Sequence, residues 1–354
     1  KLRIPYHSRW RHFEAGGVDR KAQLERLMGD LPTVTKVHAM IDLTFVSVLL
    51  DAGAGPDWKY VEPATGQTFT RSEGLAVASF HAFTSGLFSS DKDRPWQADS
   101  EGLRALVTDH LASAFQVSER NPMVGLDGRA VLLRRLGEAM AEQPEVFGEE
   151  TAARPSGIFD KIIPGPSVPP TADVAAHDIL SQILLTLSGI WPSSNSIGVV
   201  PLGDCWRHAA VRGDGLSDGW VPFHKLSQWL TYSLLEPFEW AGVKTRGLDA
   251  LTGLPEYRNG GLMIDSGLLR LRDESVAQQV WQPGDELIVE WRALTLALLD
   301  DVALHVRKLL HLDAQHLPLA CVLEGGSWAA GRALAQKHRG GLPPLQVASD
   351  GTVF

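Results

Sequence analysis

The chain has 354 residues, of which 44% are hydrophobic and 21% are charged, so it is long enough for one large domain or two ordinary ones. Its formal net charge of −9 is the opposite of the basic footprint of a nucleic-acid-binding protein, and we expect no DNA or RNA partner. Two cysteines, Cys205 and Cys321, are too few for a disulfide framework, and no apolar run approaches the roughly 18 residues of a transmembrane helix.

The first 150 residues are predicted to be mostly helical. No signal-peptide pattern opens the chain, so the cytosol is the expected location. We expect the basic side chains near the start to lie at the surface, namely Arg3, Arg9, Arg11 and His12. Apolar spacing predicts helices over residues 18–30, 37–50, 72–88, 101–117 and 128–143.

A β-hairpin is predicted over about residues 58–70. Two short segments rich in aromatic residues and threonine flank the turn Pro63-Ala64-Thr65-Gly66, which is typical of two strands. The glycine-rich loop at 51–56 lacks the spacing of a dinucleotide-binding loop and follows no clear strand, so we exclude that kind of site.

The second half of the chain is also predicted to be helical. Residues 151–170 are rich in proline and glycine and form the best candidate linker. Helices are expected over 175–191, 222–237, 285–310 and 328–338. We therefore predict a mainly α protein with one small hairpin. An N-terminal part (1–150) and a C-terminal part (171–354) pack as one compact unit, with the active site between them.

The stretch from Thr252 to Gly267 combines a turn with the start of a helix. Pro255 disfavours helix before Glu256, and the apolar residues after Tyr257 predict a helix that packs one face inward. Glu256 would then stand at the helix N-terminus, which favours an ionised carboxylate beside Arg258. The residues leave two interpretations open: a catalytic carboxylate, or a helix-end charge with an ion pair.

Other polar residues are weaker candidates for a site. Lys225, Gln228 and Tyr232 share one stripe of a predicted helix, which could line a cleft or face solvent. Serines at 193, 194 and 196 lack a GxSxG pattern, and we expect them in turns or caps. Several tryptophans could stack on a ligand or lie in the core, namely Trp58, Trp191, Trp206 and Trp229.

A metal site is possible but carries no motif. Asp204 and His208 are four residues apart, which would align two ligands on a helix. Other residues could complete such a site: His177, Asp178 and His224. Because neither HExxH nor CxxC occurs, we expect no metal.

Four long segments resemble the uracil catabolism protein 4 family of fungi and bacteria. They are HDILSQILLTLSGIWPSSNSIGVVPLGDCWRH (177–208), VPFHKLSQWLTYSLLEP (221–237), LTGLPEYRNGGLMIDSGLL (251–269) and SDGTVF (349–354). The resemblance implies an enzyme of a pathway that opens the pyrimidine ring of a uracil nucleotide or nucleoside. It further implies action on the resulting ribosylurea, with release of urea from ribose.

A more distant resemblance links the chain to the queuosine salvage nucleosidases. Phe223, Lys225, Gln228 and Leu230 match their FxKxxQxL segment, and Glu256-Tyr257-Arg258 matches their acidic-Tyr-Arg triplet, with Glu in place of Asp. Residues 66–75 are similar to their entry from hairpin to helix. This resemblance implies a helix–hairpin–helix DNA-glycosylase-like fold.

Together these observations predict an N-glycosidase. Glu256 would stabilise positive charge at the anomeric carbon or steer a water onto it, while Asp51 or Glu73 supplies or relays a proton to the departing urea. The predicted substrate-binding residues are Lys225, Gln228, Arg258, Asn195, Asp204, Asp265, Trp58 and Tyr257. We expect no cofactor and a small ribosyl substrate as the partner, with neither nucleic acid nor membrane.

Two alternatives belong to other classes. One is a metal-dependent amidohydrolase that cuts the ureide C–N bond, built on His177, Asp204 and His208. The other is a non-catalytic protein that sequesters a pathway intermediate. The sequence leaves open whether the ribose is phosphorylated.

Overall fold

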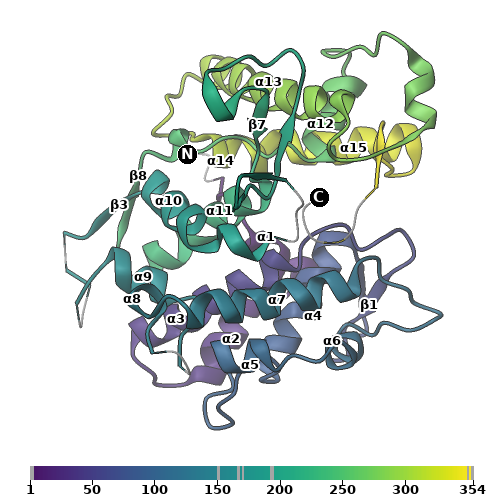
Figure 1. Ribbon diagram of the computed structural model, residues 1–354. Coiled ribbons are helices and arrows are strands. Elements are labelled where there is room, and N and C mark those ends of the chain that lie inside the picture. The colour runs from purple at the N-terminus through teal and green to yellow at the C-terminus, as the bar shows by residue number, and fades with distance from the viewer. Residues whose placement is uncertain are drawn as a thin grey trace.

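The computed structural model describes residues 4–149, 152–165, 168–169, 171–191, 195–348 and 351. This part of the chain is mainly α-helical, as predicted, and its strands occur only in two-stranded pairs. Figure 1 shows α2 to α7 in the lower half of the molecule and α12 to α15 in the upper half, with α10 and α11 between them.

Short and medium-length helices make up the first part of the fold. They are α1 (Arg9–Phe13), α2 (Arg20–Met28), α3 (Thr33–Leu49), α4 (Arg71–Thr84), α5 (Ser100–Arg104), α6 (Thr108–Ala114), α7 (Leu126–Ala141), α8 (Pro144–Phe147) and α9 (Gly157–Ile162). The single helix predicted over 101–117 is in fact two helices, α5 and α6. The predicted linker contains α9, whose Ile158 and Phe159 are buried.

The later helices are α10 (Ala176–Leu187), α11 (Lys225–Trp240), α12 (Tyr257–Asp265), α13 (Glu286–Leu310), α14 (Leu319–Val322) and α15 (Trp328–Arg339). A π-helical turn, Leu323–Ser327, joins α14 to α15. Helix α11 continues past Pro237, where the sequence predicted its end. Proline cannot donate to the carbonyl of Ser233, and the indole Nε1 of Trp10 donates to that carbonyl instead, at 3.1 Å.

The described strands form five pairs. Three are antiparallel: β1 (Lys59–Val61) with β2 (Thr68–Thr70), β4 (Ser196–Ile197) with β5 (Val200–Pro201), and β6 (Cys205–Arg207) with β7 (Trp220–Pro222). Two are parallel: β3 (Asp173–Ala175) with β8 (Lys244–Arg246), and β9 (Val280–Trp281) with β10 (Gln346–Val347). The β1–β2 pair confirms the predicted hairpin.

One large hydrophobic cluster connects the two parts of the chain, with members from Trp10 to Leu323. Within it the apolar helix α3 packs against α11. The N-terminal segment contacts the C-terminal helices: the backbone N–H of His7 donates to the carbonyl of Ala320 in α14 at 2.9 Å. His7 is therefore held beside α14 and the start of α15.

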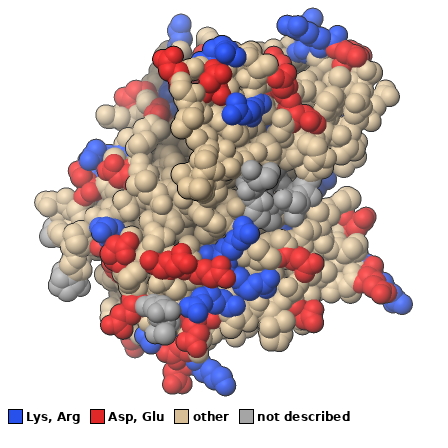
Figure 2. Space-filling model, in the orientation of Figure 1, with Lys and Arg blue, Asp and Glu red and all other residues tan. Residues whose placement is uncertain are grey.

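The described helices include none that is both long and apolar enough to cross a membrane. On the face drawn in Figure 2, Lys and Arg side chains lie among Asp and Glu side chains without forming a continuous basic surface.

Candidate active site

A cavity of about 450 Å³ lies between the two parts of the chain. The N-terminal part contributes His7, His12, the loop 51–56, the start of α4 and Val124. The C-terminal part contributes residues 254 and 256–258, Trp328, and residues 341–343 and 345–347. Lys225 and Trp229 of α11 complete the lining named here. The volume falls within the range of about 300–1,000 Å³ that is usual for small-molecule sites.

Glu256 caps the N-terminus of α12 at the cavity, as predicted. Its carboxylate accepts the backbone N–H groups of Arg258 at 2.6 Å and Asn259 at 2.8 Å. Burial nevertheless raises the pKa of Glu256, and the two N–H donors together with Lys225 and Arg258 only partly oppose that effect. The carboxylate is thus a stronger base than an exposed glutamate, whereas the sequence suggested an environment that favours its ionised form.

Two close contacts hold the start of α12 in place. The buried Asn259 donates to the carbonyl of Leu254 at 3.1 Å and accepts from the hydroxyl of Ser327 at 2.9 Å. Gly331 of α15 lies so near that a Cβ there would stand 2.1 Å from the carbonyl oxygen of Arg258. The position of Glu256 therefore depends on the packing of α12 against α15.

Lys225 begins α11 and lines the cavity. Burial lowers the pKa of Lys225, and the negative charges of Asp51 and Glu256 oppose this effect. The carboxylate of Asp204 accepts the backbone N–H of Lys225 at 3.0 Å and pairs with both Nη atoms of Arg292 at 2.7 Å. Because Arg292 also donates to the carbonyl of Pro255, Asp204 connects the segments that carry Lys225 and Glu256.

Asp51 lines the cavity at the end of α3. Its Oδ2 forms an ion pair with Nη1 of Arg9 at 2.8 Å and accepts from the indole Nε1 of Trp229 at 3.0 Å. Arg9 is completely buried and also donates to the hydroxyl of Ser47 at 2.7 Å. The predicted surface position of Arg9 is therefore wrong, because Arg9 is the partner of a buried carboxylate.

His12 is also buried, against the prediction, and it lines the cavity with Trp229 and Trp328. Its ring lies 5.7 Å from the Trp229 ring and 5.8 Å from the Trp328 ring, between centroids. Burial and the adjacent Arg9 lower the pKa of His12 to about 4. The only signal for Arg9 and His12 in the sequence was an N-terminal cluster of basic residues.

Three more predicted residues lie at the cavity. Glu73, in the first turn of α4, pairs with Arg332 at 2.5 Å. Burial opposes ionisation of Glu73, but His12 and Arg332 outweigh that effect and lower its pKa. The guanidinium of Arg258 lies over the rings of Tyr257 at 4.8 Å and Trp328 at 5.9 Å, so an aromatic wall carries a cation.

The other predicted site residues lie outside the cavity lining. Trp58 is fully buried and donates to the carbonyl of Phe115, and Asp265 pairs with Arg339 at 2.6 Å. The amide of Asn195 donates to the carbonyl of Cys205. Gln228 is 7% exposed within α11, and Asp204 is engaged by Arg292. Tyr232 is buried with its hydroxyl on the carbonyl of Thr252, so the predicted polar stripe is mostly inside the protein.

The helical spacing considered for a rival metal site does not occur. Asp204 and His208 flank strand β6 and are not on a helix, so their spacing does not align them. Across the described ranges, no group of three or more His, Cys, Asp or Glu side chains is placed to hold a metal ion. Of the serines considered for catalysis, Ser193 and Ser194 lie outside the described residues.

Comparisons with known proteins give a consistent picture. A family described as "Protein of unknown function (DUF1688)" matches residues 1–354. "Protein urg3" of Schizosaccharomyces pombe is 42% identical over 359 residues, which cover 99% of this chain and 84% of the relative. "Uracil catabolism protein 4" of Lachancea kluyveri is 40% identical over 379 residues, with 99% and 85% covered.

Proposed function

This chain belongs to the uracil catabolism protein 4 family, and on that premise we propose that it hydrolyses the N-glycosidic bond of ribosylurea, or of a closely related ribosyl ureide. The name of the Lachancea kluyveri relative supports a role in uracil catabolism. The observation that carries the proposal is the convergence of Glu256, Asp51 and Lys225 on one cavity of small-molecule size.

The proposed reaction replaces the bond between the anomeric carbon and the ureide nitrogen with a bond to water oxygen. Positive charge develops at the anomeric carbon as the nitrogen leaves with the bonding electron pair. Glu256 stabilises that charge and accepts a proton from the attacking water. Its raised pKa suits a general base, because a base whose pKa lies nearer the working pH accepts a proton more effectively.

The departing urea needs a proton or strong hydrogen bonds. Lys225 is the cation best suited to this task, because its lowered pKa makes its ammonium a more ready proton donor than an exposed lysine. Asp51 interacts electrostatically with Lys225 and can relay the proton. Glu73 is less suited to donate, since its pKa is lowered and Arg332 pairs with it.

The aromatic wall is assigned to binding. The ring of Tyr257 and the guanidinium of Arg258 offer a flat surface with hydrogen-bond donors, which fits a planar ureide group. We assign Arg258 to the ureide carbonyl or a ribose hydroxyl.

We also propose a helix–hairpin–helix DNA-glycosylase-like ancestry for the fold. Support comes from the hairpin β1–β2 that leads directly into α4, and from the triplet Glu256-Tyr257-Arg258 at the cavity. An experimental structure whose helices around the cavity superpose on such a glycosylase would support this ancestry, and a different helix order would contradict it.

Product analysis tests the activity. Incubation with ribosylurea should give urea and ribose in equal amounts, and the 5′-phosphorylated compound should be assayed in parallel to establish which form is used. Ammonia and carbon dioxide from the purified protein would instead indicate an amidohydrolase. Binding of ribosylurea without any product would indicate a sequestering protein.

A further inference from the structure

Two buried polar atoms of cavity residues have no hydrogen-bond partner within the described part of the chain. They are Nε2 of His12 and Oδ1 of Asp51, on residues that are 6% and 8% exposed. Leaving a buried donor or acceptor unpaired costs roughly 1–3 kcal/mol, so native structures rarely do so without a reason. Their position at a cavity indicates a ligand that completes the pairing.

Arg9 determines the tautomer of His12. Nη1 of Arg9 lies 3.1 Å from Nδ1 of His12, and a guanidinium can only donate. Nδ1 must therefore accept, which leaves the single proton of a neutral imidazole on Nε2. The unpaired Nε2 is consequently a hydrogen-bond donor.

The same guanidinium group fixes the role of Asp51. Oδ2 forms the ion pair with Arg9 Nη1 and accepts from the Trp229 indole, so Oδ1 is the oxygen left to accept. Nη1 also donates to the carbonyl of Ser72 at 3.0 Å, which holds the guanidinium in place. Arg9 thus prepares one donor and one acceptor at the same cavity.

We propose that His12 Nε2–H and Asp51 Oδ1 form a recognition pair for an uncharged polar group of the ligand, and that Arg9 is the residue that positions the pair. The group must present one acceptor and one donor. The amide edge of a ureide and the hydroxyls of ribose both do so. A phosphate dianion does not fit, because the Asp51 carboxylate repels it and it has no hydrogen-bond donor.

The charged and titratable neighbours of His12 lie on several elements. Among these neighbours Arg9 of α1 has the largest effect on the pKa of His12. Smaller effects come from Asp51 at the end of α3, Glu73 of α4 and His7 of the N-terminal segment. The positive charge of Arg9 and the burial of the ring favour the neutral form, whereas the two carboxylates favour the protonated one. A neutral ring at pH 7 agrees with the pKa of about 4.

Nitrogen NMR of the histidine-labelled protein tests the proposal without requiring activity. At pH 7 the His12 ring should show the neutral Nε2–H tautomer, and a saturating amount of urea or D-ribose should shift its Nε2 resonance. The probe that produces the shift identifies which part of the substrate the pair binds. His81 is the internal control, because its Nε2 lies 2.7 Å from Oε1 of Glu62 and neither residue lines the cavity. The His81 resonances should not shift when either probe is added.

Two variants separate recognition from structural effects. His12→Phe keeps a ring but removes Nε2–H, and it should weaken binding of the effective probe by roughly two- to tenfold, the worth of one hydrogen bond. Arg9→Lys keeps a hydrogen-bond donor beside His12 and should retain the Nε2–H tautomer of His12. Arg9→Met removes that donor and should lose the preference for this tautomer.

A protonated ring, an Nδ1–H tautomer in the unmodified protein, or a His12 resonance that neither probe shifts would overturn the proposal. The ligand's identity as a ribosyl ureide rests on the proposed function, but the recognition pair does not. A protein that binds urea or ribose at His12 and yet leaves ribosylurea intact would refute the hydrolase and support the pair.

Discussion

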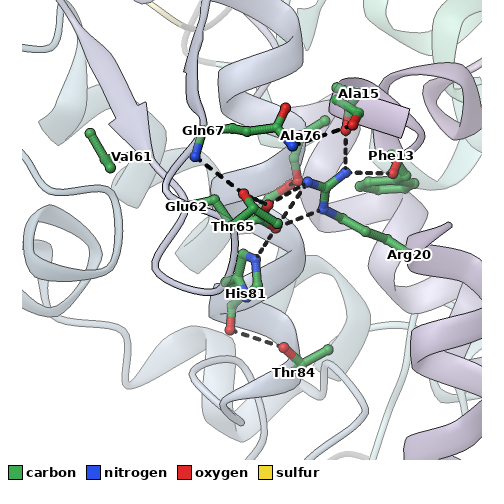
Figure 3. A network of polar contacts seen from close by, with 12 residues as sticks. Phe13, Ala15, Arg20, Val61, Glu62, Thr65, Gln67, Ala76, His81 and Thr84 are labelled. Carbon is green, nitrogen blue, oxygen red and sulfur yellow. Dashed lines mark hydrogen bonds and ion pairs between the residues drawn. The ribbon is translucent and has the colours of Figure 1, made fainter. Parts of the chain in front are cut away.

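Two clusters, each with a buried arginine and a buried carboxylate beside a histidine, differ in how completely their buried polar atoms are paired. The first consists of Arg20, Glu62 and His81 (Figure 3). Arg20 donates to both oxygens of Glu62 at 2.9 Å, and His81 and Thr65 each approach the same carboxylate at 2.7 Å. The remaining Nη1 of Arg20 donates to two backbone carbonyls.

The second cluster consists of Arg9, Asp51 and His12 at the cavity. It has the same three residue types, but one oxygen of Asp51, one nitrogen of His12 and Nη2 of Arg9 have no hydrogen-bond partner among the described residues. A fully paired buried network specifies and rigidifies the fold, whereas an incompletely paired one at a cavity is prepared for a partner from outside. The comparison separates a structural cluster from a binding cluster.

Removing the carboxylate of the first cluster should have the largest effect on stability. Glu62→Gln leaves Arg20 buried without its counter-charge, so the free energy of unfolding should fall by about 3–5 kcal/mol in chemical denaturation. The turnover of the folded variant should be unchanged, because Glu62 is absent from the cavity lining. A stability change below about 0.5 kcal/mol would show that the pairing contributes little.

The pH dependence of stability sharpens the same point. Burial opposes ionisation of Glu62, but hydrogen bonds from His81, Thr65 and Arg20 outweigh it and lower its pKa from 4.5. The folded state then binds fewer protons than the unfolded state, so this stabilisation is present above about pH 4.5 and is lost as the pH falls through the folded-state pKa. Glu62→Gln should flatten the acid limb of the stability profile.

A ligand should stabilise the second cluster. In the Glu256→Gln variant, which is expected to bind without turnover, ribosylurea at about 100 times its Kd should raise the free energy of unfolding by about 2.7 kcal/mol. The double variant Glu256→Gln/His12→Phe should show a smaller rise in the free energy of unfolding at the same ribosylurea concentration. An unchanged melting temperature at saturating ribosylurea would contradict a binding role for the cavity.

A backbone contact tests how Glu256 is positioned. Gly331→Ala would place a methyl group against the Arg258 carbonyl, so α12 or α15 must shift, at a cost of about 1–3 kcal/mol. The turnover of Gly331→Ala should also fall, because Glu256 caps the N-terminus of α12. Gly326→Ala is the matched control, since its Cβ would meet no atom within 4 Å. Equal effects of the two substitutions would contradict the positioning role.

The smallest effect is expected at Gln228. Its Oε1 is buried without a partner within the described residues, and the side chain is absent from the cavity lining. Replacing an unsatisfied amide with the similarly sized methionine should change stability by less than about 1 kcal/mol and leave KM unchanged. A large rise in KM for Gln228→Met would instead support the substrate contact that was predicted for Gln228 from the sequence.

Structural features that depend on residues close together in the chain were predictable from the sequence. Pro255 and the following apolar pattern were sufficient to locate the start of α12 and the capping role of Glu256. The hairpin and the long helix α13 followed from equally local signals, a turn and the spacing of apolar residues.

Features that depend on distant contacts were not predictable in this way. Arg9 and His12 are buried because the N-terminal segment crosses to the C-terminal helices, and nothing in their immediate sequence encodes that crossing. Gln228 and Tyr232 are buried because α11 is covered on more than one side, so one helical stripe could not separate a cleft from the core. Asp204 supports the site from outside the cavity lining through Arg292, a residue 88 positions away.

The most direct test of the account is the rate of urea release from ribosylurea by Glu256→Gln. The variant keeps the size and most of the hydrogen bonding of the side chain but removes its charge and basicity, so turnover should fall by roughly 10²–10⁴-fold. Asp265→Asn changes a carboxylate of the same helix that pairs with Arg339 outside the cavity, and it should retain nearly full turnover. Near-normal urea release by Glu256→Gln would contradict the assignment of Glu256 as the catalytic carboxylate.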